Sequence, residues 1–372
     1  IITGLQDNGT KLISNGVWDD VKGGDGMECL IDYTDINIQY GTYVNGQISR
    51  TTNHWVSSTA IEPNGAGSGA WVTPYIIDPV DHNTLYAGYA DVWKTTNKGN
   101  NWTKISTINT GSKIRAMAIS ESDNDVIYVS DPNDIWKTTN GGGSWTNINN
   151  NLPLSNSSLN YIAVKSDDPN TIWVALSGYN SNNVYQSTNG GSTWTNISSG
   201  LPQLPCYTIV QNTQISGSVH LYVGTELGVY FKNGTDSWIE YNSGLPNVQC
   251  GELETYYASN PADSKLRLAS YGRGLWESPL TQENSNLASV LTSTPANITT
   301  NSATLGGNVT DEGSSNVTER GVVWSTSPNP NTNDNKIVNS GTGTGSFTES
   351  LSGLSPATLY YTKAYAINNA GT

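Results

Sequence analysis

The chain has 372 residues, with 31 acidic against 17 basic side chains and a formal net charge of −14. This acidic balance disfavours nucleic acid and anionic membrane surfaces as partners. No apolar run is long enough for a membrane-spanning helix, so we expect no membrane insertion. The length suits two domains, each able to bury a core of its own.

The predicted elements are short strands separated by turns. Residues 1–22 predict the latter strands of one repeat unit, over 1–6, 10–14 and 17–20. Five whole units follow, each with the order strand, Asp-rich turn, strand, hairpin, short strand, Asx-Gly turn and Trp strand. They span residues 27–66, 67–109, 110–154, 155–203 and 204–246. Residues 247–280 add strands near 252–257, 266–270 and 274–277.

Three stretches, at residues 94–102, 137–145 and 186–194, are near copies that read Ser/Thr-x-Asn-x-Gly-x-x-Trp. They recur every 43 to 49 residues, a period typical of a radially repeated all-β array. The Asn closes a tight turn on its own backbone, the Gly supplies a positive φ, and the Trp packs as an apolar plug. The positions concerned are Thr95, Asn97, Gly99, Trp102, Thr138, Asn140, Gly142, Trp145, Ser187, Asn189, Gly191 and Trp194.

These copies resemble the Asp-box, or BNR repeat, with Asn in place of the acid. The resemblance implies an all-β β-propeller over residues 1–280, with the boxes on the outer rim in a structural role. If strands from both ends of the chain combine to close the ring, the propeller is six- to seven-bladed. The segments at residues 18–26 and 271–276 resemble stretches of Asp-box propellers of secreted Bacteroidetes-type proteins and, more loosely, of the sortilin and xyloglucanase-like groups.

A second domain is predicted after a polar linker at residues 281–287. Residues 354–360, Leu-Ser-Pro-Ala-Thr-Leu-Tyr, and the run at 363–371 resemble a conserved stretch of fibronectin type III domains. That resemblance implies a C-terminal Ig/fibronectin type III-like sandwich over 288–372, with a Tyr that makes the corner bond. The last strand is missing, and the first unit starts part-way, so we expect the chain to continue into further domains upstream and downstream.

The cysteines and histidines indicate no metal or cofactor chemistry. Cys206 and Cys250 precede the innermost strands of neighbouring units, where they either form a bridge or remain free buried thiols. The three histidines lie in turns or at a strand start, without metal spacing. Asp-rich turns such as 166–169 could hold structural calcium, but turn capping is the favoured interpretation.

Two segments depart from the repeat, at residues 18–26 and 271–276. A glycosidase needs two carboxylates about 5 to 9.5 Å apart. Asp25 is the best single candidate, and Glu252 is one of several possible partners, which also include Asp19, Asp20 and Glu254.

Trp18 offers a platform for a sugar ring, and Trp18, Asp25 and Arg273 are the candidate binding residues. The competing interpretation is that Asp25 caps a turn and Arg273 pairs with a neighbouring carboxylate. Only five arginines are present, in scattered contexts, which disfavours a sialidase.

These features favour a binding or adhesion module over an enzyme. The family resemblance implies a secreted or surface-displayed bacterial protein, exported by a type IX pathway, whose partner is a glycan or a protein outside the cell. The alternative is a glycoside hydrolase of xyloglucanase-like type with paired carboxylates. A third hypothesis makes both domains spacers in a long stalk.

Overall fold

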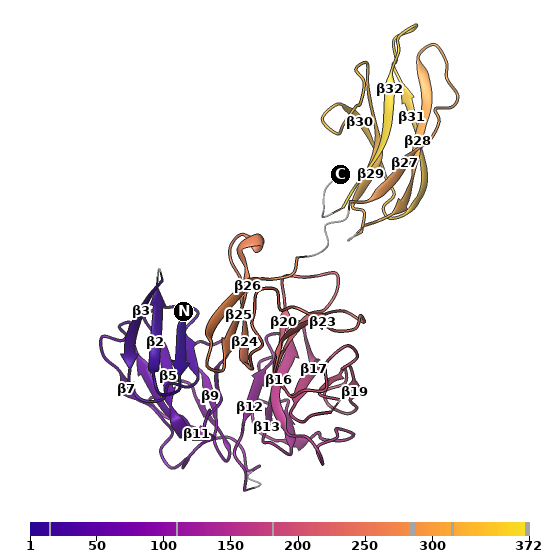
Figure 1. Cartoon of the computed structure of the whole chain (residues 1–372). Helices are drawn as coiled ribbons and strands as arrows, with labels where there is room; N and C mark the ends of the chain where they lie inside the picture. Colours follow the sequence, from indigo (N-terminus) through magenta and orange to yellow (C-terminus); the bar gives the residue numbers. More distant parts are fainter. Residues whose placement is uncertain (15, 109–110, 181, 283–286, 314–315, 369–372) are drawn as a thin grey trace. The chain divides into compact units, whose positions relative to one another are not determined.

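The computed structural model of the chain (Figure 1) describes residues 1–14, 16–108, 111–180, 182–282, 287–313 and 316–368. Its regular structure is strand, apart from two short 3-10 turns at Val44–Gly46 and Pro261–Asp263. The chain divides into two compact units, one comprising Ile1–Gln214 with Val219–Leu280 and the other Ile215–Ser218 with the residues from Thr281 onward. Within the predicted linker 281–287, residues 283–286 lie outside the described part.

The described residues of the first unit form seven antiparallel sheets, five of four strands and two of three. The sheet nearest the N-terminus is β1 (Ile2–Leu5), β2 (Gly9–Ser14) and β3 (Val17–Lys22). The four-stranded sheets are β4 (Cys29–Ile31), β5 (Gln39–Tyr43), β6 (Gln47–Thr51) and β7 (Thr59–Ala60); β8 (Tyr75–Ile77), β9 (Leu85–Gly88), β10 (Val92–Thr95) and β11 (Thr103–Lys104); β12 (Ala116–Ile119), β13 (Ile127–Ser130), β14 (Ile135–Thr138) and β15 (Thr146–Asn147); β16 (Leu159–Lys165), β17 (Asp168–Leu176), β18 (Val184–Ser187) and β19 (Thr195–Asn196); and β20 (Cys206–Asn212), β21 (His220–Thr225), β22 (Gly228–Asn233) and β23 (Ile239–Glu240). The last sheet is β24 (Cys250–Tyr256), β25 (Lys265–Ser270) and β26 (Gly274–Pro279). Each four-stranded sheet falls inside one of the five predicted repeat units.

The core of the first unit lies between neighbouring sheets. The second strands β9, β13 and β21 are buried along their whole length. A strand covered on both faces can be apolar at every position instead of alternating. Trp173 in β17 and Tyr222 in β21, both fully buried, fill the spaces between successive sheets. This packing is the face-to-face stacking of a β-propeller.

The Asn-containing boxes form the turn between the third and fourth strands of three sheets. In the third copy, the Ser187 hydroxyl donates to Asn189 Oδ1 at 2.9 Å and accepts the Gly191 N–H at 2.9 Å. The Trp194 indole N–H then donates to the Ile148 carbonyl of the preceding sheet at 2.9 Å. We call this bond the rim link.

The rim link recurs in the other copies. Trp102 donates to Ile61 at 2.6 Å, and Trp145 donates to Ile105 at 2.9 Å. Trp238, in a degenerate copy, donates to Ile197 at 2.7 Å. Each box therefore fastens its own sheet to the previous one.

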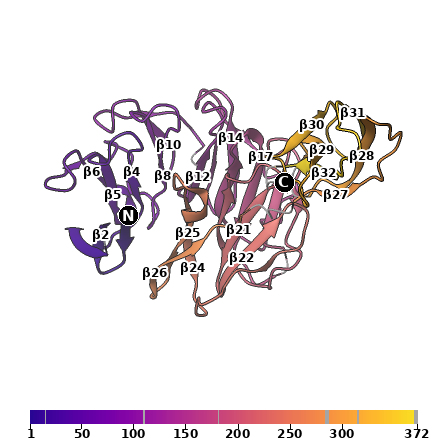
Figure 2. The same cartoon turned by 90° about the horizontal axis from the view of Figure 1, so that it is seen from above.

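The two three-stranded sheets are the first and the last sheet of the first unit in chain order. No ladder joins β1–β3 to β24–β26 among the described residues, so the two do not combine into one mixed sheet. In the view from above, the N-terminus lies beside β2 and β5 (Figure 2). Burial and then the charge of Arg267 lower the pKa of the Ile1 ammonium, whereas Glu277 raises it. Arg267 and Glu277 belong to β25 and β26, so the charge of the N-terminus responds to charges of the last sheet.

In the part of the second unit that the structure describes, the strands form two three-stranded antiparallel sheets. One has the order β27 (Ser289–Thr292), β28 (Ser302–Asp311), β31 (Gly345–Ser352), and the other β30 (Asn335–Asn339), β29 (Glu319–Ser325), β32 (Tyr361–Ile367). They share an apolar core that includes Leu305, Val322, Phe347 and Ala364. The Tyr360 hydroxyl accepts the Ser355 N–H at 3.2 Å. Residues 369–371 of the fibronectin-like run lie outside the described part.

Candidate functional site

Two ends of the first unit follow from the strand order. In each antiparallel sheet, the loop that enters the first strand and the hairpin between the second and third strands lie at one end. The box, which joins the third and fourth strands, lies at the other end. Hydrogen bonds tie several of these hairpins to the next entry loop, as between Asn45 N–H and the Trp71 carbonyl (3.2 Å) and between Ile114 N–H and the Tyr89 carbonyl (2.8 Å). We call these the loop end and the box end.

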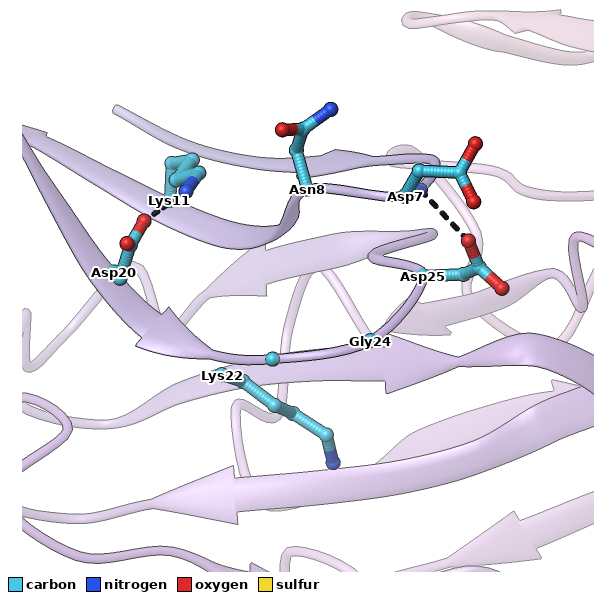
Figure 3. Close-up of a pocket in the computed structure, with 8 residues that line it drawn as sticks. Asp7, Asn8, Lys11, Asp20, Lys22, Gly24 and Asp25 are labelled. Atoms are coloured by element: carbon cyan, nitrogen blue, oxygen red, sulfur yellow. Dashed lines mark hydrogen bonds and ion pairs between the residues drawn. The ribbon is translucent and has the colours of Figure 1, made fainter.

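A cavity of about 510 Å³ opens at the loop end of the first sheet. It lies between the β1–β2 hairpin, the strands β2 and β3, and the loop that leads to β4 (Figure 3). We call it the N-terminal cavity; its lining residues are Asp7, Asn8, Lys11, Asp20, Lys22, Gly23, Gly24 and Asp25. Its volume is within the range of small-molecule sites, but its walls are polar.

Asp25 has a structural contact in this cavity. Its Oδ1 accepts the Asp7 N–H at 2.7 Å, and Asp7 has a positive φ of 62°. The carboxylate therefore stabilises a left-handed turn, which agrees with the turn-capping interpretation. In Figure 3 its other oxygen, Oδ2, points away from Asp7.

The two lysines of the cavity are engaged with neighbours. Lys11 Nζ pairs with Asp20 Oδ1 across the β2–β3 ladder. Lys22 Nζ donates to Ser49 Oγ, and its side chain points away from Asp7 and Asp25 in Figure 3. Apart from these two lysines, the polar side chains that line the cavity are mainly hydrogen-bond acceptors. Little positive charge in the cavity is left without a bonding partner.

Trp18 lies on β3 near the β2–β3 hairpin, and it does not itself line the N-terminal cavity. It is two residues before Asp20, so the pleat puts both side chains on one face, about 7 Å apart along the strand. Trp18 is 48% exposed. Its cross-strand partner is Ile13, and β3 has no further strand on its outer side among the described residues. An exposed indole thus shares a strand face with Asp20, which lines the polar cavity.

Arg273 and Tyr271 lie in the β25–β26 hairpin, which the strand order also puts at the loop end. Both are exposed, and the Arg273 carbonyl accepts the Trp276 indole N–H at 3.1 Å. Arg273 does not line the N-terminal cavity. Glu252 does not line it either, so the structure does not bring Asp25 and Glu252 together there.

Glu252 instead belongs to an acidic cluster formed by first strands and a loop. Glu252 and Glu254 lie on β24, Tyr161 lies on β16, and Glu28 comes immediately before β4. The Tyr161 hydroxyl donates to Glu252 Oε1 at 3.3 Å. Glu252 and Glu254 are separated by the buried Leu253 and share a face of β24, about 7 Å apart along the strand.

Burial and mutual repulsion perturb this cluster strongly. Burial, and then the charge of Glu254, raise the pKa of Glu252 to about 7, while the Tyr161 hydrogen bond lowers it. Burial and then Glu252 and Glu254 raise the pKa of Glu28 well above its ordinary value. Burial raises the pKa of Glu254, opposed by Arg267. The Glu254 side chain remains exposed to solvent, although protein surrounds its carboxyl.

Sequence reasoning selected Glu252 but missed Glu28 and Tyr161. Glu28 lies only three residues after Asp25 and directly before the first strand of a sheet. This position could have identified it in the sequence as a candidate. Tyr161 had no sequence signal, because its hydroxyl meets Glu252 from a strand 91 residues away.

The other site expectations can be located as well. Cys29, Cys206 and Cys250 are all free. Asp168, in the Asp-rich turn, accepts the Asn170 N–H at 3.0 Å and the Thr171 hydroxyl at 2.7 Å, which are turn contacts. No group of three or more His, Cys, Asp or Glu side chains in the described ranges is arranged to hold a metal ion. None of the described helices is long and apolar enough to cross a membrane.

Comparison with known proteins shows the fold. The family model of sortilin (Sortilin-Vps10; neurotensin receptor 3) matches residues 90–228, which is less than half of the chain. The matched range includes the three Asn-containing boxes at residues 94–102, 137–145 and 186–194. No curated protein matches the chain.

Among solved structures, an ancestral GH74 enzyme is 15% identical with a TM-score of 0.56, and the match covers 88% of this chain and 38% of that one. The GH74 enzyme of Niastella koreensis is 17% identical with a TM-score of 0.57, covering 82% and 55%. The extracellular domain of a protein described as a hybrid two component system from B. thetaiotaomicron is 12% identical with a TM-score of 0.55, covering 100% and 52%.

The chain thus spans about half or less of each of these proteins. Together with the boxes, the matches establish a β-propeller of the Asp-box type.

Proposed function

We propose that this chain is a binding module that recognises a neutral carbohydrate outside the cell, through the N-terminal cavity and Trp18. The observation that carries the proposal is the pairing of an acceptor-rich cavity with an exposed indole on the same strand face. Sugar hydroxyls donate to carboxylates and amides, and the apolar face of a sugar ring stacks on an aromatic side chain.

The charge distribution supports a neutral ligand over an acidic one. Lys11 and Lys22 are engaged with Asp20 and Ser49, and the whole chain carries a net charge of −14. An anionic polymer would meet repulsion at this surface. A protein partner is the competing outcome.

The proposal includes three wider points. The seven sheets of the first unit act as a seven-bladed ring whose ends meet through β1–β3 and β24–β26. The second unit is a fibronectin type III-like sandwich, supported by the Ser355–Tyr360 bond and its shared core. The chain is part of a larger secreted or surface protein, an idea supported by its likeness to extracellular domains.

A glycan array followed by titration calorimetry tests the binding function. We expect Trp18→Ala to weaken binding of an array-positive sugar by about tenfold or more, since buried aromatic anchors contribute over 1 kcal/mol. Tyr33→Ala is the control, because Tyr33 is also exposed but lies in the β4–β5 turn of another sheet and does not line the cavity. Equal losses in both variants, or a full array without a signal, would refute this function.

The acidic cluster supports glycoside hydrolysis as a second candidate. Glu252 has a pKa of about 7 and could act as the acid, while Glu254, beside Arg267, could act as the ionised partner. Their spacing along β24 of about 7 Å is within the range that paired carboxylates use. Hydrolysis of a panel of β-glucans, lost in Glu252→Gln and retained in Asp25→Ala, would establish this activity. An inactive unchanged chain would exclude it for that panel.

A further inference from the structure

The first box has a lysine where the other two boxes have a glycine. Lys98 takes the position of Gly141 in the second box and of Gly190 in the third. All three residues have a left-handed backbone, with φ of 57°, 62° and 67°. Glycine adopts this conformation without strain, whereas a Cβ makes it unfavourable. The strain at Lys98 is offset by contacts of its side chain, which a glycine cannot make.

The Lys98 ammonium connects two neighbouring sheets. Its Nζ donates to Asp32 Oδ2 in the turn between β4 and β5, and it lies 2.9 Å from His82 Nδ1 in the turn between β8 and β9. His82 Nδ1 in turn lies 3.0 Å from Asp32 Oδ2. The Asp32 side chain is completely buried, whereas one third of the His82 side chain is exposed. We call Asp32, His82 and Lys98 the clasp, because they join the sheet of β4–β7 to the sheet of β8–β11.

Neighbouring groups fix the positions of the clasp residues. Asp32 Oδ1 accepts both the N–H and the hydroxyl of Thr34, each at 2.8 Å, and this hydroxyl lies 2.8 Å from His82 Nδ1. The Tyr33 ring contacts the His82 ring edge-on, with 6.1 Å between the ring centroids. Other titratable groups near His82 are, on its own turn, Asp78 and Asp81.

Asp32 is a charged acceptor over the whole range in which histidine titrates. Burial raises the pKa of Asp32, but hydrogen bonds from Lys98, His82 and Thr34 outweigh burial and lower it well below its ordinary value. The two basic side chains of the clasp therefore always have one carboxylate between them.

His82 Nδ1 faces a donor and an acceptor at the same time. With its proton on Nε2, a neutral imidazole accepts at Nδ1 from the Lys98 ammonium. An imidazolium carries protons on both nitrogens, so its Nδ1 can only donate, and Asp32 is the acceptor within reach. The Lys98 ammonium then faces a second cation from 2.9 Å. Like charges at this separation repel, so protonated His82 and Lys98 compete for one carboxylate.

We infer that the clasp changes partners on acidification: Lys98 binds Asp32 while His82 is neutral, and protonated His82 displaces the Lys98 ammonium and loosens the first box. Histidine changes its charge between about pH 5 and pH 8, which sets the range of this change. Once displaced, the Lys98 side chain no longer offsets the strain of its backbone. That backbone also connects the two sheets, since the Lys98 N–H donates to the Asn83 carbonyl at 2.8 Å and the Lys98 carbonyl accepts Arg50 Nη1 of β6. The contact between the two sheets thus becomes sensitive to pH, whatever ligand the chain binds.

Hydrogen–deuterium exchange of the whole chain, read by mass spectrometry, tests this change of partners. Equivalent amides in two boxes donate to side chains of their own box: Gly99 to Thr95 and Asn101 to Asn97 in the first, and Gly142 to Thr138 and Ser144 to Asn140 in the second. Protection is the exchange rate of the unfolded peptide divided by the observed rate at the same pH. Between about pH 7.5 and pH 5, protection in the first box should fall about tenfold, whereas the second box, with Gly141 in place of Lys98, should not change.

Two variants separate the roles of the clasp residues. His82→Gln keeps a polar side chain that does not titrate, so the first box should stay protected at both pH values. Lys98→Gly gives the first box the glycine of the other two and removes the competitor, so it should also abolish the response. Equal changes in both boxes of the unchanged chain, or a response that survives in either variant, would overturn the inference. Thermal unfolding at both pH values shows that each variant keeps its fold.

Discussion

Replacement of Gly191 by Ala tests whether the boxes hold neighbouring sheets together. Gly191 has a φ of +86°, a region in which an L-residue other than Gly costs about 1–2 kcal/mol. A Cβ at this position would also lie 2.4 Å from Ile148 Cδ1 in the preceding sheet. Forcing a methyl group into a packed contact costs about a further 1–3 kcal/mol. We therefore expect Gly191→Ala to lose about 2–5 kcal/mol of unfolding free energy.

Gly244→Ala supplies the matched control. Gly244 has a similar φ of +78°, but a Cβ there meets nothing within 4 Å. Its expected cost is only the backbone part, about 1–2 kcal/mol. Both variants can be compared by equilibrium urea unfolding, read from the fluorescence of the tryptophans. Equal losses in the two variants would refute the reasoning, because the contact with Ile148 would then contribute nothing.

Three further predictions address single interactions. Trp194→Phe leaves the Ile148 carbonyl without its indole donor, so urea unfolding should show a loss of about 1–3 kcal/mol, and no loss would contradict the rim link. Glu252 has a folded pKa of about 7, above the unfolded 4.5, so its contribution to stability is present below pH 4.5 and lost as the pH rises through 7. Glu252→Gln should therefore flatten the stability profile between pH 5 and 8 by about 1–3 kcal/mol, and an unchanged slope would argue against the raised pKa. Asp32→Ala removes the buried carboxylate that pairs with Lys98 and should cost about 3–5 kcal/mol in thermal or urea unfolding, whereas a neutral result would mean that solvent replaces the partner.

The repeat could be predicted from the sequence because its signals are local. Turn formation by Asn189 and Gly191 depends on a few neighbouring residues, so spacing alone located the boxes and, through them, the sheets. These features require no knowledge of distant contacts.

The candidate sites were less accessible to prediction because they depend on contacts between sheets. Asp25 stood out as an acid among glycines, and the structure shows it bonded to the Asp7 backbone in a polar cavity. The raised pKa of Glu252 arises from burial, from Glu254 and from a Tyr161 on another sheet. Only folding brings such groups together, and a single sequence does not reveal them.

The rim link has a consequence for how such a chain can change in length. In three copies an Ile follows the Trp by three residues, at Ile105, Ile148 and Ile197, and its carbonyl receives the Trp of the next repeat. Each of these three repeats therefore carries one donor facing backward and one acceptor facing forward. Duplication of a whole repeat would preserve both hydrogen bonds at each new junction. A cut inside a repeat would leave either the Trp donor or the Ile acceptor without its partner. A whole repeat can thus be inserted or removed as one unit, in evolution or in design. The boundary of that unit lies between the Ile and the first strand of the next repeat.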